Sequence, residues 1–226
     1  MRYCTMLAVL ATGAAASSAS ADYKVIGPFC NWDNGASITM SDMGGGTWEA
    51  VIPATPNAVN EFKVNVGDWS SSWPSTGNVK VAATGSSLTV RFYDNPNPND
   101  GWSPNAARVG YVDQGGTGFD IIGSFDNWTN PIGSLASQGN GLYVGTIAIA
   151  PGNYNFKFRS SQYGWGMSGG SNLADWDNDI ALAVGADPVK FSLDVTNGRW
   201  KTENVPTPGA LGLLGLGGLV ATRRRR

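Results

Sequence analysis

The chain has 226 residues, of which 42% are hydrophobic and 14% charged, a balance that excludes a disordered protein. Its formal net charge of −2 at pH 7 excludes the strongly basic character of nucleic-acid-binding proteins. Histidine, the commonest general base and transition-metal ligand, does not occur in the sequence, so we expect no metal site and no cofactor.

Residues 1–21 have the pattern of a secretory signal peptide. Arg2 supplies the positive start, Met6 to Ala16 form a short apolar run, and Ala19-Ser20-Ala21 has the small-x-small pattern of a signal-peptidase site. We therefore expect a signal helix that signal peptidase removes before Asp22. A buried N-terminal helix is the alternative interpretation of the same apolar run.

The body contains one phrase twice, "VIGPFCNWDN" at 25–34 and "IIGSFDNWTN" at 121–130. Short segments follow each copy in the same order, and a repeat of about ninety residues indicates tandem copies of one folding unit. We therefore divide the body into a first repeat, residues 22–115, and a second repeat, residues 116–204. The segment from Asn95 to Gly118 joins them.

The segments after each phrase predict β-strands, because they are short, rich in β-branched and aromatic residues, and bounded by turn residues. In chain order they cover residues 47–54, 60–69, 78–83, 88–94, 100–104 and 107–113, then 142–150, 154–165, 178–184, 189–195 and 198–203. In "YNFKFR" at 154–159, aromatic and polar residues alternate, so the aromatic side chains should face a core. No stretch has a helical period. This pattern predicts an all-β fold with two tandem Ig-like β-sandwiches.

The tail, residues 205–226, is uncharged until the four terminal arginines. The apolar run from Val205 to Thr222 is near the lower limit for spanning a bilayer, and a terminal Arg cluster stays on the cytoplasmic side. The tail "VPTPGALGLLGLGGLVATRRRR" resembles a PEP-CTERM sorting tail. Its motif is Val205-Pro206-Thr207-Pro208, with Thr207 where the commonest form has Glu.

This resemblance implies a bacterial protein with a short C-terminal apolar helix, which exosortase cleaves near the motif before the protein reaches the cell surface or extracellular matrix. A simple C-terminal anchor is the alternative. Five of the fifteen basic residues lie in the two ends, and all seventeen acidic residues lie between them, so the body carries −7. An acidic body argues against nucleic acid or an anionic membrane as partner, and we expect membrane contact only through the tail.

The second repeat resembles the starch- and glycogen-binding Ig-like (E-set) modules found beside isoamylases and pullulanases and in the β subunit of AMP-activated kinase. The matching stretches are "GSFDNW", "YNFKF", "YGW" and "DNDIAL", within residues 118–203. The family's glucan-contacting positions correspond to Trp128, Lys157, Trp165 and Asn178. The first repeat is the weaker match and keeps three of these positions, as Trp32, Lys63 and Trp69.

The resemblance implies an exported protein that binds a polysaccharide, such as an α-glucan, without catalysis. Aromatic rings suit the flat CH faces of sugars, and a few well-placed polar groups bind the hydroxyls. Tryptophan is usually well buried, however, so the alternative is a structural or adhesion protein whose sandwiches are spacers. Trp48, Trp102 and Trp200 are expected to pack rather than bind. The absence of histidine and the small repeats disfavour an enzyme.

Overall fold

The computed structural model describes residues 22–105, 107–115, 117–175 and 178–206. The expected signal helix and C-terminal apolar helix lie outside these ranges. No helix within them has the length and hydropathy needed to span a bilayer. The described residues form seventeen β-strands and three 3₁₀ helices of 3 residues each. The prediction of an all-β chain is therefore confirmed.

The first repeat forms two sheets, with the strand orders β2-β1-β5-β6, where β7 pairs with β5, and β3-β4-β8-β9. The strands are β1 Lys24–Ile26, β2 Ile38–Thr39, β3 Ser41–Gly44, β4 Thr47–Pro53, β5 Ala58–Asn65, β6 Ser72–Trp73, β7 Val79–Ala83, β8 Ser87–Tyr93 and β9 Arg108–Tyr111. The prediction of a strand at 100–104 was wrong. The backbone bends there instead, because the Asp100 carboxylate accepts a hydrogen bond from the Trp102 backbone N–H at 3.0 Å.

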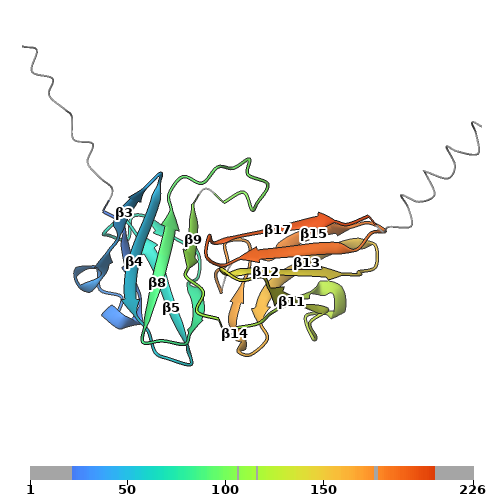
Figure 1. Ribbon diagram of the computed structural model, residues 1–226, viewed down its shortest axis with the longest axis horizontal. Coiled ribbons are helices and arrows are strands. Elements are labelled where there is room, and N and C mark those ends of the chain that lie inside the picture. Colours follow the sequence, from blue (N-terminus) through green and yellow to red (C-terminus); the bar gives the residue numbers. More distant parts are fainter. Residues whose placement is uncertain (1–21, 106, 116, 176–177, 207–226) are drawn as a thin grey trace, which may run out of the picture.

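The second repeat has the same order of pairings, connected into one sheet, β14-β13-β10-β11-β12-β16-β17, with β15 beside β13. The strands are β10 Phe119–Gly123, β11 Gly133–Ser137, β12 Leu142–Ile147, β13 Gly152–Ser160, β14 Gly164–Gly169, β15 Ile180–Val184, β16 Val189–Asp194 and β17 Arg199–Asn204. Here β11 pairs with both β10 and β12, so it joins two layers. Figure 1 shows the first repeat at the left and the second at the right.

Each repeat is sandwich-like, with aromatic side chains packed between its layers. On β13, Phe156 and Phe158 are buried as the alternation predicts, and the Phe156 ring lies 5.2 Å from that of Phe191 on β16. In the first repeat, the Tyr23 ring lies 4.9 Å from Trp48 and 4.8 Å from Phe92. These contacts place the core where strand alternation puts the apolar side chains.

Two tryptophans expected to pack do so in the cores. Trp48 is buried, and Trp200 has its ring 6.2 Å from Phe156 and donates its indole N–H to the Ser171 carbonyl at 2.9 Å. Trp102 packs differently, because its ring lies under the guanidinium of Arg199 at 4.3 Å. All three tryptophans therefore pack against other residues of the protein, as expected.

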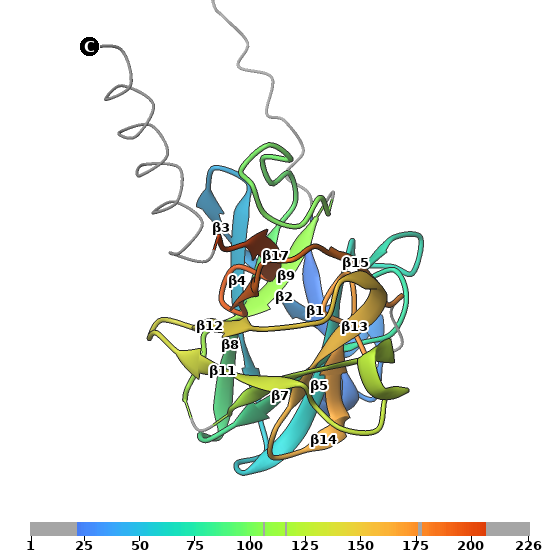
Figure 2. The same cartoon turned by 90° about the vertical axis from the view of Figure 1, so that its right-hand side faces the viewer.

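The two repeats meet at a close junction. Figure 2 looks along the long axis of the molecule, with the second repeat in front of the first. The Tyr111 N–H of β9 donates to the Val195 carbonyl at 3.0 Å. Asp175, whose side chain is 6% exposed, accepts a hydrogen bond from the Asn78 N–H at 2.8 Å and forms an ion pair with Lys80 at 2.9 Å. One contiguous cluster of buried apolar residues runs through both repeats. The repeats therefore pack as one body.

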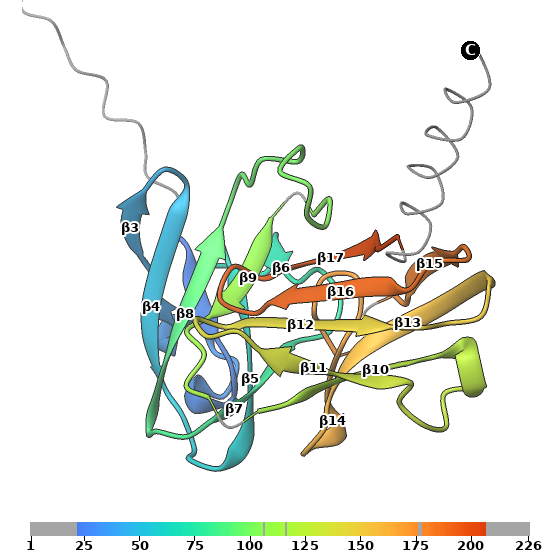
Figure 3. The same cartoon turned by 45° about the vertical axis from the view of Figure 1, so that its right-hand side comes forward.

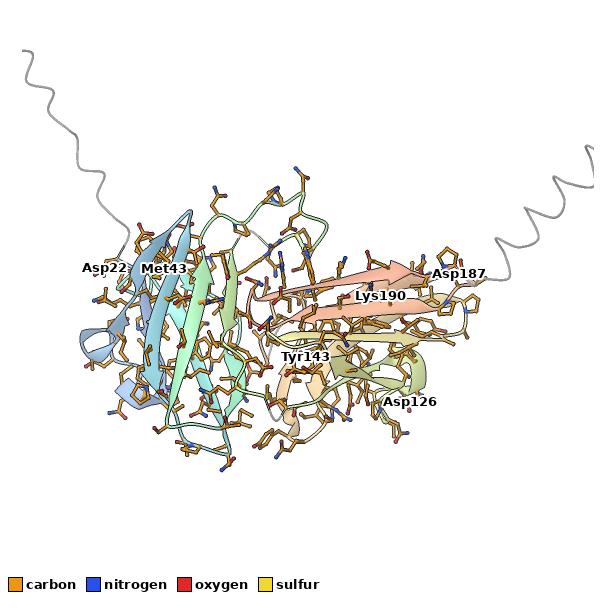
Figure 4. The ribbon with its side chains drawn as sticks, viewed as in Figure 1. Asp22, Met43, Asp126, Tyr143, Asp187 and Lys190 are labelled. Carbon is orange, nitrogen blue, oxygen red and sulfur yellow. The ribbon has the colours of Figure 1, made fainter. Side chains whose placement is uncertain are left out.

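The joining segment is held on both sides. Tyr143 of β12, labelled in Figure 4, donates its hydroxyl hydrogen to the Asp113 carboxylate at 2.6 Å. Nearer β9, the Arg108 guanidinium is only 4% exposed and donates to the Asp100 carboxylate at 2.7 Å and to the Ser103 carbonyl at 2.8 Å. The segment between the repeats is therefore anchored by polar contacts rather than being a free linker.

The Asp100 carboxylate should make the stability of the chain depend on pH in the acid range. Its hydrogen bond from Arg108 lowers the pKa from 3.8 to about 2. The ionised form therefore stabilises the folded chain above pH 4, and this contribution is lost as the pH falls towards 2. Solvent screens this partly exposed pair, so the contribution is small. Between pH 4 and pH 2 we expect the free energy of unfolding to fall by about 1 kcal/mol more in wild type than in Asp100→Asn. Urea unfolding at several pH values would measure this difference. The same dependence of unfolding free energy on pH in the two proteins would contradict the prediction.

Candidate functional site

The repeated phrase folds into a turn that presents its tryptophan. In the second repeat it forms η3, Ser124–Asp126, after which Asn127 and Trp128 have left-handed backbone angles, with φ of 57° and 64°. The Trp128 N–H donates to the Gly123 carbonyl at 2.9 Å and closes the turn. A side chain at Gly123 would collide with the Asn155 carbonyl. Asparagine tolerates the left-handed region well, so the phrase specifies this turn locally.

The first repeat forms the same turn. Its η1 spans Pro28–Cys30, and Asn31 and Trp32 again have positive φ, at 52° and 59°. The Trp32 N–H donates to the Gly27 carbonyl at 3.1 Å. The two phrases are therefore one structural motif used twice, and the repeated glycine is required because the backbone of the neighbouring strand passes close to it.

The outer face of the second repeat carries the polar side chains of β13. Lys157 and Arg159 lie opposite Ile122 and Asp120 of β10 in the strand register. They point away from the core that holds Phe158, as the alternation predicts. Both cations keep acidic neighbours: Lys157 lies 3.5 Å from Asp179, and Arg159 lies 3.9 Å from Asp120. The face therefore offers donors and acceptors side by side.

Two of the predicted binding residues meet on this face. The rings of Trp128 and Trp165 lie 6.1 Å apart with an angle of 45° between their planes. Trp165 of β14 is 49% exposed, whereas Trp128 is half-buried. The Arg159 guanidinium carbon lies 5.6 Å from the centre of the Trp165 ring. The two indoles therefore form an aromatic surface bordered by a cation.

The other two predicted residues border the same region. The Lys157 side chain is 14% exposed and reaches Asp179, and Asn178 is the exposed residue directly before Asp179. The backbone carbonyl of Asn178 accepts a hydrogen bond from Ser171 at 2.9 Å. Lys157 thus lies on β13 and Trp165 on β14, while Trp128 follows β10 and η3 and Asn178 precedes β15, two strands that pair with β13. The family resemblance did not point to Arg159. The alternation of side chains along β13 could have indicated it, because Arg159 is the next outward-facing cation after Lys157.

The first repeat does not assemble its equivalent residues in this way. Trp69 is 51% exposed and Trp32 half-buried, but the ring contacts of the described residues include no pair between them. Burial lowers the pKa of Lys63, and the nearby Asp175 carboxylate of the second repeat opposes that shift. Because Asp175 also binds Lys80, the second repeat lies against the face where a first site would be. Trp73 packs in the core, 4.9 Å from Phe92.

Part of the predicted sorting motif is described. Val205 follows the end of β17 directly, and its N–H donates to the Pro188 carbonyl at 2.9 Å. Pro206 is exposed. Thr207 and Pro208 lie outside the described residues. The predicted motif therefore begins directly after β17.

No family model matches the chain, and no curated protein matches it. Among solved structures, the crystal structure of SusF from Bacteroides thetaiotaomicron is similar, with 16% identity and a TM-score of 0.29, over 84% of this chain and 49% of that one. The chain thus spans about half the length of that protein. At this TM-score the similarity carries no inference about fold or function.

Proposed function

We propose that the chain is an exported, non-catalytic carbohydrate-binding protein whose second repeat binds a polysaccharide such as an α-glucan. The observation that carries the proposal is the pair of indoles at Trp128 and Trp165, 6.1 Å apart, with Trp165 half exposed. An exposed large aromatic side chain in a face whose charges are paired is the kind of group that becomes buried on ligand binding. Sugar rings present CH faces that stack on such indoles.

The polar groups around the indoles suit hydroxyls. The Lys157 ammonium and the Arg159 guanidinium donate hydrogen bonds, and the partly exposed Asp179 carboxylate accepts them. Asp120, a second carboxylate of this face among the described residues, is buried and accepts a hydrogen bond from the Ser134 hydroxyl at 2.8 Å. Glycoside hydrolysis needs two carboxyl groups that flank the scissile bond. With Asp120 held in this way, the face is suited to binding rather than to hydrolysis.

We also propose an Ig-like fold for each repeat and a location outside the cell. The recurrence of one pairing order in both repeats supports two Ig-like sandwiches, residues 22–115 and 116–204. The signal pattern and the PEP-CTERM-like tail support export through signal peptidase, transient anchoring by the tail, and exosortase sorting to the cell surface or matrix. The first repeat would then carry no second indole site, because the second repeat lies against part of its equivalent face.

Isothermal titration of the protein with maltoheptaose and a panel of matrix polysaccharides tests the function. We expect saturable binding to one class of glycan at one site per chain. Absence of binding to every member of the panel would contradict the proposal. The close junction between the repeats would then favour the second candidate function, a rigid spacer in a matrix or adhesion protein.

A further inference from the structure

A cleft of about 650 Å³ lies where the two repeats meet on the side of β14. Its walls come mainly from the first repeat, with Pro28 and Phe29 of η1, the chain from Ile52 to Thr55, and Glu61 and Lys80 of β5 and β7. Gly166 of β14 closes it from the second repeat. Its volume lies within the ~300–1,000 Å³ of typical small-molecule sites.

The cleft borders the strand that carries one indole of the second repeat. Gly166 directly follows Trp165 in the chain, so the two Cα atoms are only about 3.8 Å apart. Both residues are exposed. β14 contacts β7 of the first repeat, and Figure 3 shows β14 at the lower edge of the second repeat. Strand β14 therefore contributes Trp165 to the indole pair and the next residue, Gly166, to the cleft.

The lining of the cleft suits a neutral ligand rich in hydroxyls. Phe29 and Pro28 offer apolar surface, while Glu61 and Lys80 lie opposite each other in the register of β5 and β7. The Lys80 charge is already balanced by Asp175 of the second repeat, 2.9 Å away. The Glu61 Oε2 atom accepts a hydrogen bond from the Asn78 side chain at 3.3 Å, and Oε1 has no partner among the described residues. That oxygen can accept a hydrogen bond from a sugar hydroxyl.

We infer that one polysaccharide chain binds across both repeats, with some sugar units on Trp128 and Trp165 and the following units in the cleft. This inference rests on the proposed function and deepens it, because it makes the ligand a long glycan chain rather than a short oligosaccharide. The first repeat contributes through the wall that η1, β5 and β7 build, not through a copy of the indole site. Binding should therefore strengthen with the length of the oligosaccharide.

The experiment compares maltotriose, which is long enough only for the indoles, with maltoheptaose by isothermal titration. We expect wild type to bind maltoheptaose more tightly than maltotriose. Glu61→Ala should weaken maltoheptaose binding three- to tenfold, about the net effect of one hydrogen bond, and leave maltotriose binding unchanged. Glu203→Ala is the matched control, because Glu203 is an exposed, ion-paired acid on β17 away from the cleft.

A second variant narrows the cleft without removing a contact. Thr55 is exposed and lines the cleft, so Thr55→Leu should also reduce the gain from chain length. Equal affinities of wild type for the two sugars would overturn the inference while leaving the indole site intact. The same would follow if both variants kept the full preference of wild type for maltoheptaose over maltotriose. Failure of maltotriose and maltoheptaose alike to bind wild type would overturn the proposed function for α-glucan, and the inference with it.

Discussion

Trp165→Ala is expected to weaken glycan binding roughly thirtyfold, or about 2 kcal/mol, the loss typical of a tryptophan at the centre of a binding surface. The free energy of unfolding should stay within about 0.5 kcal/mol of wild type, because the side chain is already half exposed. The substitution removes one of the two stacked surfaces and leaves Trp128 without its ring partner at 6.1 Å. Titration with maltoheptaose and urea unfolding measure the two quantities.

Trp69→Ala provides a matched control in the first repeat. Trp69 is 51% exposed, close to the 49% of Trp165, so its removal changes the same type and amount of surface. We expect unchanged binding, because Trp69 has no ring contact with Trp32 in the described structure. Equal losses in the two variants would mean that both repeats bind. Unchanged binding in both would contradict the proposed site.

Gly110→Ala is expected to lower the free energy of unfolding by about 3 kcal/mol, the upper range for overpacking a closely packed site. A Cβ atom at Gly110 would collide with the Thr196 carbonyl and lie 2.8 Å from the Gly198 amide nitrogen. Both groups are main chain in the β16–β17 turn, so no side chain can rotate away. The added methyl group would push the repeats apart beside the Tyr111 to Val195 hydrogen bond.

Gly185→Ala is the control for this prediction. A Cβ atom there has no heavy atom within 4 Å, so we expect a change of no more than about 0.5 kcal/mol. Urea unfolding of both variants measures the difference. A junction that loosens before the repeats unfold would give two transitions for Gly110→Ala instead of one. Equal stability of the two variants would show that the junction does not contribute to the stability of the chain.

Most of the long strands could be predicted because their alternation is a local rule, although the segment 154–165 is two strands, β13 and β14, with a turn at 161–163. Alternation with a period of two assigned Phe156 and Phe158 to the core and Lys157 to the outer face. The wrong strand at 100–104 has a local cause too. The Asp100 side chain accepts a hydrogen bond from the backbone N–H of Trp102, which favours a turn over strand pairing. The aromatic and polar composition of the segment does not distinguish the two.

The sequence by itself determined the all-β fold, the repeated turn at Trp32 and Trp128, and the face on which each β13 side chain lies, because backbone preference and strand period act between near neighbours. Only the tertiary structure decided that Trp128 meets Trp165, that Asp175 docks beside Lys80, and that a cleft opens beside Gly166. These contacts join segments far apart in the chain, so they depend on how the two repeats pack. That packing is set by shape and burial over the whole junction, which no short pattern of residues encodes.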